Sequence, residues 1–314
     1  MKNGKIILAD TFHPVFSELL IAEGFTIEEG YQLTATEISS RINEWDGIAI
    51  RSRFKIDSAF LNNATGLRFI ARGGAGMENI DVKAATDKGI ACLSAPEANR
   101  DAVGEQATAM LLMLMNNLLR ADHEVRQGQW NREKNRGHEL QGKTIGIIGY
   151  GNMGSSFAQR LQGFDVKVLA YDKYIRLQTS LSYVKQAELN ELFQECDVIS
   201  LHLPLTEETN YFANADFFSA FHKPIWFVNT ARGKNTDTAA LVDALQSGKV
   251  RGAALDVLEY ETTSFEDFDK TTMPPPLQYL ISSDKVVLSP HIGGWTFESH
   301  EKIAKALVSK ILAL

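Results

Sequence analysis

The sequence predicts an α/β protein with two doubly wound parallel-sheet domains and a cleft between them. Three observations support this prediction. Short apolar segments typical of buried strands alternate with segments of helical periodicity. A glycine-rich turn follows one strand near the middle of the chain. Polar residues follow several other strands, where an open α/β sheet places its ligands. The length of 314 residues corresponds to about two domains.

The first part of the chain, residues 1–98, is expected to form one of the two domains. Its predicted strands are 5–9, 25–28, 47–51, 67–71 and 90–93. Its predicted helices are 14–23, 34–42, 60–64 and 81–87. The second of these helices begins with a Thr34-x-x-Glu37 capping box. Regular alternation of this kind predicts a parallel sheet with helices on both faces.

A single long helix is predicted over residues 99–120, where alanine, valine, leucine and methionine occupy most faces. Residues 127–140 are polar and irregular apart from Trp130, and they are interpreted as an exposed arm or part of a dimer contact. The helix and the arm together favour a homodimer. Packing within the core explains the apolar helix equally well.

The glycine-rich turn gives the most specific pattern in the chain. A buried strand at 144–148 is followed by Gly149, Gly151 and Gly154, and a helix is predicted to start at Asn152 or Met153. The first glycine permits a tight turn, the second allows backbone to approach a pyrophosphate, and the third allows close packing of helix on strand. A second strand at 166–171 ends at Asp172, whose carboxylate suits a ribose 2′-hydroxyl and repels a 2′-phosphate. The pattern predicts a Rossmann-like domain that binds NAD rather than NADP.

The remaining segments extend this second domain, which is expected to cover residues 99–291. Its further strands are predicted at 198–203, 224–229, 252–257 and 285–288, and its helices within 182–193, at 214–221 and at 238–247. Residues 260–283 contain three consecutive prolines and are interpreted as a long loop or lid. Residues 292–314, which contain an amphipathic helix at 297–312, are expected to return to the first domain.

Composition and charge exclude several classes of partner. The net charge of −7 argues against nucleic acid or an anionic membrane surface. Cys92 and Cys196 lie in apolar runs without a second cysteine or histidine at metal spacing. They are therefore expected to be reduced, as in the cytoplasm, and no metal site is predicted. No apolar stretch has membrane-spanning length.

The segments that follow the strands of the second domain resemble those of the D-isomer-specific 2-hydroxyacid dehydrogenases. The resemblance rests on the glycine turn together with HLPLT (202–206), NTARG (229–233), ALDVLEYE (254–261) and SPHIGG (289–294). Within that family the chain is most similar to short-type D-3-phosphoglycerate dehydrogenases, through IRSR (50–53), RGGAGMENID (72–81) and residues 96–105.

Three residues of these segments suit the oxidation of a 2-hydroxy acid, and the resemblance assigns them the same roles. His291 suits the base that accepts the hydroxyl proton. Glu261 suits the carboxylate that orients the imidazole, with Glu259 as an alternative and Glu266 as a more remote one. Arg232 suits the cation that binds the substrate carboxylate.

The resemblance also implies binding residues. Asp256 is expected near the nicotinamide carboxamide. The other residues expected to line the NAD site, beside the glycine turn, are His202, Pro204, Thr209, Thr230, Ala231 and Gly294. The first domain is expected to bind substrate. A phosphorylated substrate suits the cations Arg51, Arg53 and Arg72. The other residues expected to contact substrate are Gly74, Ala75, Gly76 and Asn99.

The resulting hypothesis is an NAD-dependent dehydrogenase that converts D-3-phosphoglycerate to 3-phosphohydroxypyruvate in serine biosynthesis. A glyoxylate or hydroxypyruvate reductase is the alternative within the enzyme class, because unphosphorylated substrates do not need Arg51 and Arg72. An NAD-sensing binding protein of the corepressor kind is the alternative from another class. The presence of arginine, glutamate and histidine at the expected positions argues against it.

Overall fold

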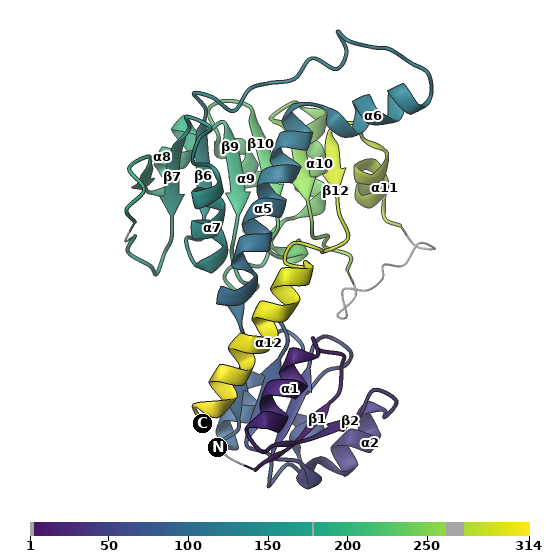
Figure 1. The fold of residues 1–314 in the computed structure, drawn as a ribbon. Coiled ribbons are helices and arrows are strands. Elements are labelled where there is room, and N and C mark those ends of the chain that lie inside the picture. Colours follow the sequence, from purple (N-terminus) through teal and green to yellow (C-terminus); the bar gives the residue numbers. More distant parts are fainter. Residues whose placement is uncertain (1–2, 178, 262–272) are drawn as a thin grey trace. The chain divides into compact units, whose positions relative to one another are not determined.

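The structure is a computed structural model that describes residues 3–177, 179–261 and 273–314 (Figure 1). It divides into two compact units. The first contains the described residues up to Arg100 together with Gly294–Leu314, and the second contains Asp101–Glu261 together with the described residues up to Gly293. Each unit is a parallel sheet with helices packed on it, as the alternating pattern predicts.

The first unit contains a five-stranded sheet in the order β2-β1-β3-β4-β5, with parallel pairing throughout. Its strands are β1 (Lys5–Leu8), β2 (Thr26–Glu29), β3 (Gly47–Ile50), β4 (Phe69–Arg72) and β5 (Ala91–Leu93). Its helices are α1 (Val15–Ala22), α2 (Ala35–Ser40), α3 (Ser58–Leu61), α4 (Val82–Asp87) and α12 (Phe297–Leu312), with a short 3-10 turn at Ile42–Glu44. The capping box at the start of α2 is confirmed, with both reciprocal hydrogen bonds present.

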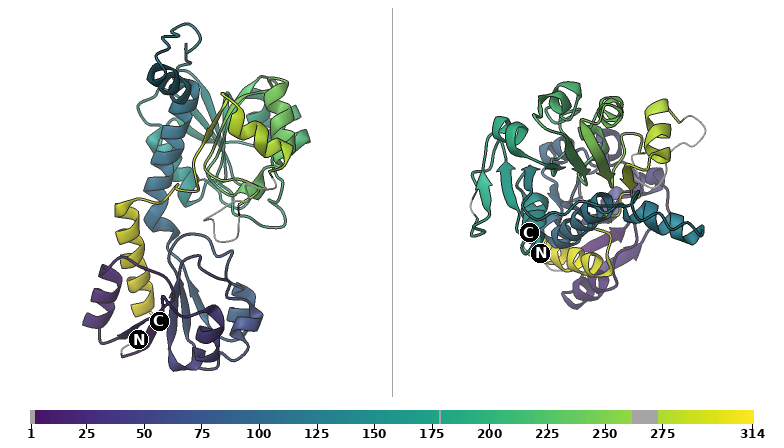
Figure 2. Two further views of the ribbon diagram at one scale, coloured as in Figure 1. Left: turned by 90° about the vertical axis from the view of Figure 1, so that its right-hand side faces the viewer. Right: turned by 90° about the horizontal axis from the view of Figure 1, so that it is seen from above.

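Alternating side chains of these strands form the two halves of the first unit's core. Ile7 and Ile48 face one side, where they pack with residues of α2, α3 and α4. Ile6 and Leu8 face the other side, where α1 and α12 lie next to each other (Figures 1 and 2). The C-terminal helix therefore completes the core of the N-terminal sheet.

The second unit contains a seven-stranded parallel sheet in the order β12-β11-β10-β9-β6-β7-β8. Its strands are β6 (Thr144–Ile148), β7 (Lys167–Tyr171), β8 (Val184–Gln186), β9 (Val198–Leu201), β10 (Ile225–Asn229), β11 (Val250–Leu255) and β12 (Val286–Leu288). The chain runs outward from β6 through β7 to β8, then returns to the other side of β6 and continues from β9 to β12. The strand order therefore reverses between β6 and β9, which is where doubly wound sheets bind ligands.

Helices cover both faces of this sheet (Figures 1 and 2). One face packs against α5 (Pro96–Met115), which enters this unit at Asp101, and α7 (Asn152–Arg160). The other face packs against α8 (Leu189–Glu195), α9 (Ala215–Ala220), α10 (Thr238–Gln246) and α11 (Pro275–Ser282). A further helix, α6 (Leu118–Arg126), follows α5, and a 3-10 turn covers Gly233–Asn235. No described helix combines the length and apolar character needed to cross a membrane.

The structure corrects several predicted elements. The single helix at 99–120 is wrong: α5 ends at Met115 and α6 starts at Leu118, because Asn117 adopts a left-handed backbone conformation with φ 52°. The predicted loop at 260–283 contains α11, which begins with prolines in its first turn. Residues 262–272 of that predicted loop lie outside the described residues. The edge strand β8 was missed, since two of its three residues are exposed and polar.

Candidate active site

The glycine turn between β6 and α7 has the geometry of a dinucleotide site. Gly149 has φ +91°, and a Cβ there would lie 2.5 Å from the carbonyl oxygen of His202. A Cβ on Gly154 would lie 2.0 Å from the carbonyl oxygen of Gly149, so α7 packs directly on the turn. In contrast, a Cβ on Gly151 would meet no described atom within 4 Å. The helix starts at Asn152 and Met153 without a side-chain cap, so its positive end suits a pyrophosphate.

Asp172 lies at the end of β7, as expected for the acid that binds ribose. Its carboxylate accepts backbone N–H groups from Tyr150 at 2.8 Å, Tyr174 at 2.9 Å and Ile175 at 2.8 Å. A carboxylate offers about four acceptor positions, so one remains for a ribose hydroxyl. A pocket of about 550 Å³ adjoins it, and most of its lining side chains are polar, among them Lys173, Arg176, Gln186 and Glu188. These contacts are compatible with the predicted hydrogen bond from a ribose 2′-hydroxyl to Asp172.

Two polar atoms near the ends of β9 and β10 are buried without a partner among the described residues. They are Nδ1 of His202 and Oγ1 of Thr230. The other ring nitrogen of His202 lies 2.9 Å from the Ser200 hydroxyl, and burial lowers the pKa of His202 to about 3. The imidazole is therefore neutral at physiological pH. Buried polar atoms of this kind usually have partners, so these two fit a site that a cofactor completes.

The loop after β9 is held by its own hydrogen bonds. The hydroxyl of Thr209 donates to the carbonyl of Pro204 at 2.6 Å, and the amide of Asn235 donates to the same carbonyl at 3.3 Å. Thr209 and Pro204 were both expected in the NAD site. The structure brings these two residues together at the end of the sheet where the glycine turn also lies.

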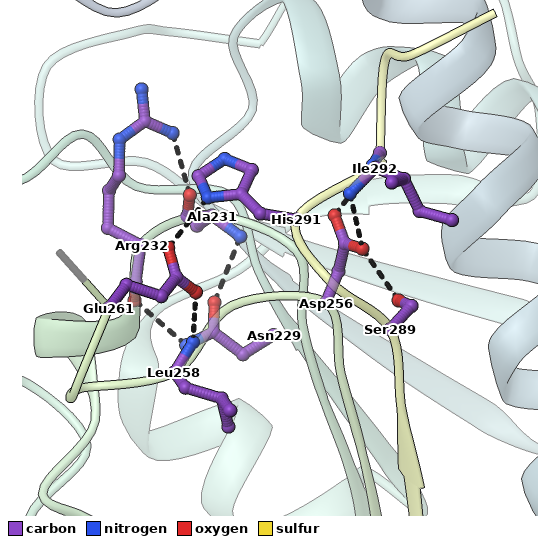
Figure 3. Close-up of polar contacts among 10 residues, drawn as sticks. Asn229, Ala231, Arg232, Asp256, Leu258, Glu261, Ser289, His291 and Ile292 are labelled. Atoms are coloured by element: carbon purple, nitrogen blue, oxygen red, sulfur yellow. Dashed lines mark hydrogen bonds and ion pairs between the residues drawn. The ribbon is translucent and has the colours of Figure 1, made fainter. Parts of the chain in front are cut away.

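The turn that carries Arg232 is organised by Asn229, a buried residue at the end of β10 that the sequence analysis did not single out. Its amide donates to the carbonyl of Arg232 at 3.0 Å, and its side-chain oxygen accepts the N–H of Ala231 at 2.9 Å (Figure 3). A Cβ on Gly233 would lie 2.0 Å from the carbonyl oxygen of Leu258. The turn therefore packs tightly on the loop after β11, and the Arg232 guanidinium donates to the Ala231 carbonyl at 2.6 Å.

His291 and Glu261, separated by 30 residues, form a direct contact. Nδ1 of His291 lies 2.7 Å from a carboxylate oxygen of Glu261 (Figure 3). Both side chains are largely buried, with exposed fractions of 22% and 16%. A carboxylate at Nδ1 selects the tautomer whose Nε2 accepts a proton. The other oxygen of Glu261 accepts the N–H of Leu258, which fixes the carboxylate.

Glu259, the predicted alternative, has different partners. Its carboxylate accepts the hydroxyl of Tyr211 at 2.7 Å and the N–H of Thr238 at 3.1 Å, at the start of α10. The hydrogen bond to Glu259 raises the pKa of Tyr211 to about 12. The structure thus places Glu261 beside the imidazole and Glu259 at a helix terminus. Glu266, the more remote alternative, lies outside the described residues.

Asp256 anchors the loop that carries His291. Its buried carboxylate accepts the Ser289 hydroxyl at 2.6 Å and the N–H groups of Ile292 at 2.9 Å and Gly293 at 2.7 Å (Figure 3). Burial raises the pKa of Asp256, and these three hydrogen bonds oppose that effect. The N–H of His291 also donates to the Asp256 carbonyl at 2.8 Å. These contacts give Asp256 a role in positioning His291, and the nicotinamide contact that the resemblance implies stays a prediction.

The backbone of His291, whose N–H is bound by the Asp256 carbonyl, has a left-handed conformation. The residue has φ +54°, a value that few residues other than glycine adopt.

Gly294, expected in the NAD site, belongs to the first unit, where its carbonyl accepts the Ser299 hydroxyl at 2.5 Å. Ser289 was not singled out as a site residue, although it begins the SPHIGG segment.

The predicted substrate residues lie in the first unit. The backbone N–H of Arg51 donates to Asp10 at 2.7 Å, and its guanidinium lies 4.1 Å from the ring centroid of Trp295. Arg53 instead donates through both terminal nitrogens to the carbonyls of Ala9, Gly30 and Leu33. These contacts give Arg53 a structural role, and its predicted contact with substrate stays a prediction.

Arg72 and the glycine segment after β4 form one tight turn. A Cβ on Gly74 would lie 1.7 Å from a terminal nitrogen of Arg72, so the guanidinium lies directly against that glycine. Ala75 and Gly76 follow it and are half-buried. The side-chain oxygen of Asn99 is buried without a partner among the described residues. Within those residues, no group of three or more histidine, cysteine or acidic side chains could hold a metal ion.

The chain is similar in sequence to a known family of enzymes. Residues 108–293 match the family described as "D-isomer specific 2-hydroxyacid dehydrogenase, NAD binding domain". The chain is 34% identical over 304 residues to a D-3-phosphoglycerate dehydrogenase of Sus scrofa, with 96% of this chain and 55% of the relative covered. The chain thus spans about half the length of that curated relative.

Two other similarities cover nearly the whole of both chains. A hydroxypyruvate reductase of Thermotoga maritima is 38% identical over 279 residues, with coverage of 89% of this chain and 88% of the relative. A D-lactate dehydrogenase of Aquifex aeolicus, solved with NAD and lactic acid, has a TM-score of 0.82 at 29% identity and covers 98% of this chain and 94% of its own.

Proposed function

Since the chain belongs to the D-isomer specific 2-hydroxyacid dehydrogenases, we propose that it transfers hydride between NAD and D-3-phosphoglycerate. The products are NADH, a proton and 3-phosphohydroxypyruvate, as in serine biosynthesis. The observation that supports dehydrogenase chemistry most directly is the 2.7 Å contact between His291 and Glu261. Oxidation of a hydroxyl needs a base, and this pair has the form of a base held by a carboxylate.

In this proposal, each site residue of the second unit has a separate role in the reaction. NAD, when bound, supplies the hydride acceptor. His291 accepts the hydroxyl proton at Nε2 as the C2–H bond breaks, and Glu261 stabilises the resulting imidazolium. Arg232 binds the substrate carboxylate and polarises the C2 oxygen, because a planar guanidinium can donate to both oxygens. Asp256 holds the loop of His291 in place through Ser289, Ile292 and Gly293.

The proposed NAD-binding residues are those whose geometry fits the cofactor. The open side of Gly151 and the first N–H groups of α7 hold the pyrophosphate. Asp172 accepts a ribose hydroxyl. The buried, unpartnered atoms of His202 and Thr230 complete their hydrogen bonding with the cofactor.

Cations in the first unit support the phosphorylated substrate. With a net charge of −7, the chain needs a local concentration of positive charge to bind a phosphate. Arg51 and Arg72 provide it in this proposal, whereas Arg53 is used to bind backbone carbonyls. Reduction of hydroxypyruvate is the second candidate, because the Thermotoga maritima relative bears that name and matches along nearly its whole length.

An NADH oxidation assay over a panel of 2-keto acids tests the proposal. We expect the highest kcat/KM with phosphohydroxypyruvate. In the Arg51→Ala variant, KM for that substrate should rise roughly 10- to 100-fold, because a charge-assisted hydrogen bond is lost, while KM for hydroxypyruvate changes little. The variant His291→Ala should lose at least about a hundredfold in kcat while still binding NAD.

Three outcomes are decisive. Equal or better turnover of hydroxypyruvate, unaffected by Arg51→Ala, would favour the reductase. Turnover of His291→Ala within tenfold of the parent protein would remove His291 from the mechanism. No reduction of any 2-keto acid, with NADH still bound, would favour an NAD-sensing binding protein.

A further inference from the structure

Two histidines and an arginine from three separate segments of the first unit lie together. The rings of His13, after β1, and His300, on α12, meet edge to face with centroids 5.7 Å apart. Arg51, after β3, influences His300 electrostatically, as His13 does. Its guanidinium lies over the ring of Trp295, which is 66% exposed. We refer to these four residues as the His–Arg cluster.

In each of the two imidazoles, Nε2 can still form a hydrogen bond with a ligand. Nδ1 of His13 accepts the backbone N–H of Val15 at 3.3 Å, so Nε2 carries the proton of the neutral ring. Nε2 of His300 is buried with no partner among the described residues. A buried ring nitrogen in this state gains most from a ligand that can form a hydrogen bond with it.

The acidic side chains near the cluster have partners of their own, and a further cation lies nearby, so the site suits an anion. Glu301 on α12 is paired with Lys305 at 2.6 Å, and this pairing is the main cause that lowers the pKa of Glu301. Asp10 is engaged by the backbone N–H groups of Arg51 and Arg53. Arg72, at the end of the neighbouring strand, adds a further positive charge next to Gly74.

The groups around His300 favour its neutral form. Burial first, then the positive charges of Arg51 and His13, lower the pKa of His300 below its usual value. A bound dianion would reverse the electrostatic part of this effect, since an opposite charge favours the imidazolium. Binding and protonation would then support each other.

We propose that His13, Arg51 and His300 form a phosphate-monoester subsite whose occupation is coupled to the uptake of a proton by His300. This inference rests on the proposed function for the identity of the substrate that bears the phosphate. The exposed Trp295 ring holds the Arg51 guanidinium beside the imidazoles through a cation–π contact. The cluster would distinguish a phosphorylated 2-keto acid from its unphosphorylated counterpart by charge.

Steady-state kinetics test the subsite through a comparison of two substrates. We measure KM for hydroxypyruvate divided by KM for phosphohydroxypyruvate between pH 7 and 9, where the phosphate is a dianion. Effects of His291 on both substrates cancel in this ratio. We expect the ratio to fall with rising pH in the parent protein. In His300→Gln it should be about tenfold lower at pH 7 and independent of pH.

His13→Gln should lower the same ratio, and His222→Gln serves as the matched control because His222 is exposed in the second unit. Unfolding by urea confirms that each variant is folded. An unchanged ratio in both His13→Gln and His300→Gln, or an equal change in KM for both substrates, would overturn the proposal.

Calorimetry provides a readout that does not require turnover. Inorganic phosphate is titrated into the NAD-saturated protein in two buffers of different ionisation enthalpy, which counts the protons taken up. We expect net proton uptake on phosphate binding at about pH 8.5, where inorganic phosphate is already a dianion, in the parent protein and none in His300→Gln. Absence of proton uptake in the parent protein would refute the coupling. If no 2-keto acid is reduced, the proposed function fails, and this titration still decides the subsite.

Discussion

At the residue scale, two glutamates on one loop have different partners, and only one of them contacts the candidate base. Glu259 and Glu261 are two residues apart, yet only Glu261 contacts His291, while Glu259 binds Tyr211 and the start of α10. The sequence analysis ranked Glu261 first but retained Glu259, because either carboxylate can be reached along a loop. The choice depends on the turn after Leu258, whose N–H is bound by Glu261 itself.

A matched pair of variants separates these two roles. Glu261→Gln should lower kcat about a hundredfold, because the amide cannot stabilise an imidazolium and its NH2 group selects the wrong tautomer. Glu259→Gln should leave kcat within about threefold and lower the free energy of unfolding by about 1 kcal/mol, through a weakened contact at the start of α10. Assays of kcat and urea unfolding on both variants check this. The reverse assignment of effects would exchange the two roles.

His202 makes a pH-dependent contribution to stability. Its folded-state pKa of about 3 lies below the ordinary value of 6.5, so the unfolded chain takes up this proton first. The stabilisation is therefore present above about pH 6.5 and is lost as the pH falls towards 3, by up to about 1.4 kcal/mol per unit.

Replacement of His202 should remove this dependence. We expect the loss of unfolding free energy between pH 7 and pH 5 to be about 2 kcal/mol smaller in His202→Gln than in the parent protein, because glutamine does not titrate. Urea unfolding at both pH values measures the difference. The exposed His222, changed to glutamine, is the control and should leave the dependence unaltered. Identical pH dependence in His202→Gln would show that His202 is readily protonated in the folded protein.

At the element scale, the unit β6–turn–α7–β7 was predictable almost residue by residue. The glycine spacing sets the turn, and α7 starts at Asn152 as expected. The break between α5 and α6 was not predictable, because asparagine is tolerated within helices and only the left-handed φ of Asn117 ends the run. Edge strand β8 was missed for a related reason, since an exposed strand lacks the apolar run that marks buried ones.

The site was predictable to a similar extent. The residue types and the resemblance to the family pointed to Arg232, Glu261 and His291, and the structure brings Glu261 and His291 together. The positioning residues Asn229 and Ser289 were missed, because nothing in a sequence tells which polar residue will be buried with its hydrogen bonds directed at a neighbouring turn. The structural use of Arg53 was missed because its partners are backbone carbonyls of distant segments.

Two glycines of the turn should respond differently to substitution by alanine. Gly154→Ala places a methyl group 2.0 Å from a backbone carbonyl, so we expect a loss of about 1–3 kcal/mol in unfolding free energy. Gly151→Ala meets no described protein atom within 4 Å and should leave stability unchanged. It should weaken NAD binding more than about tenfold, because the methyl group occupies the space proposed for the pyrophosphate. Urea unfolding and NADH fluorescence titration separate the two effects. Unaltered NAD affinity in Gly151→Ala would place the pyrophosphate elsewhere.

At the scale of the whole molecule, functional residues and apolar surface occur on different parts of the second unit. The glycine turn, Arg232 and His291 all follow carboxyl ends of strands. Apolar side chains on α6 and the following arm are exposed instead. Leu118 is 50% exposed, Val125 51% and Trp130 77%. Leu118 and Val125 are seven residues apart and therefore share one face of the helix. Exposed apolar residues gathered in this way are typical of a protein–protein contact.

We therefore expect α6 and the arm to form the contact of a homodimer. The parent protein should sediment at about twice its chain mass of 34.8 kDa, and the double variant Val125→Asp, Trp130→Ser should shift towards that chain mass, because a charge then replaces apolar contact area. Ile21→Asp is the control: Ile21 is 57% exposed on α1 in the other unit, and this variant should keep the parent mass. Sedimentation equilibrium at micromolar concentration measures all three proteins. A parent protein that sediments as a monomer would assign these side chains to another partner, and dissociation of the Ile21 variant alone would move the dimer contact to the first unit.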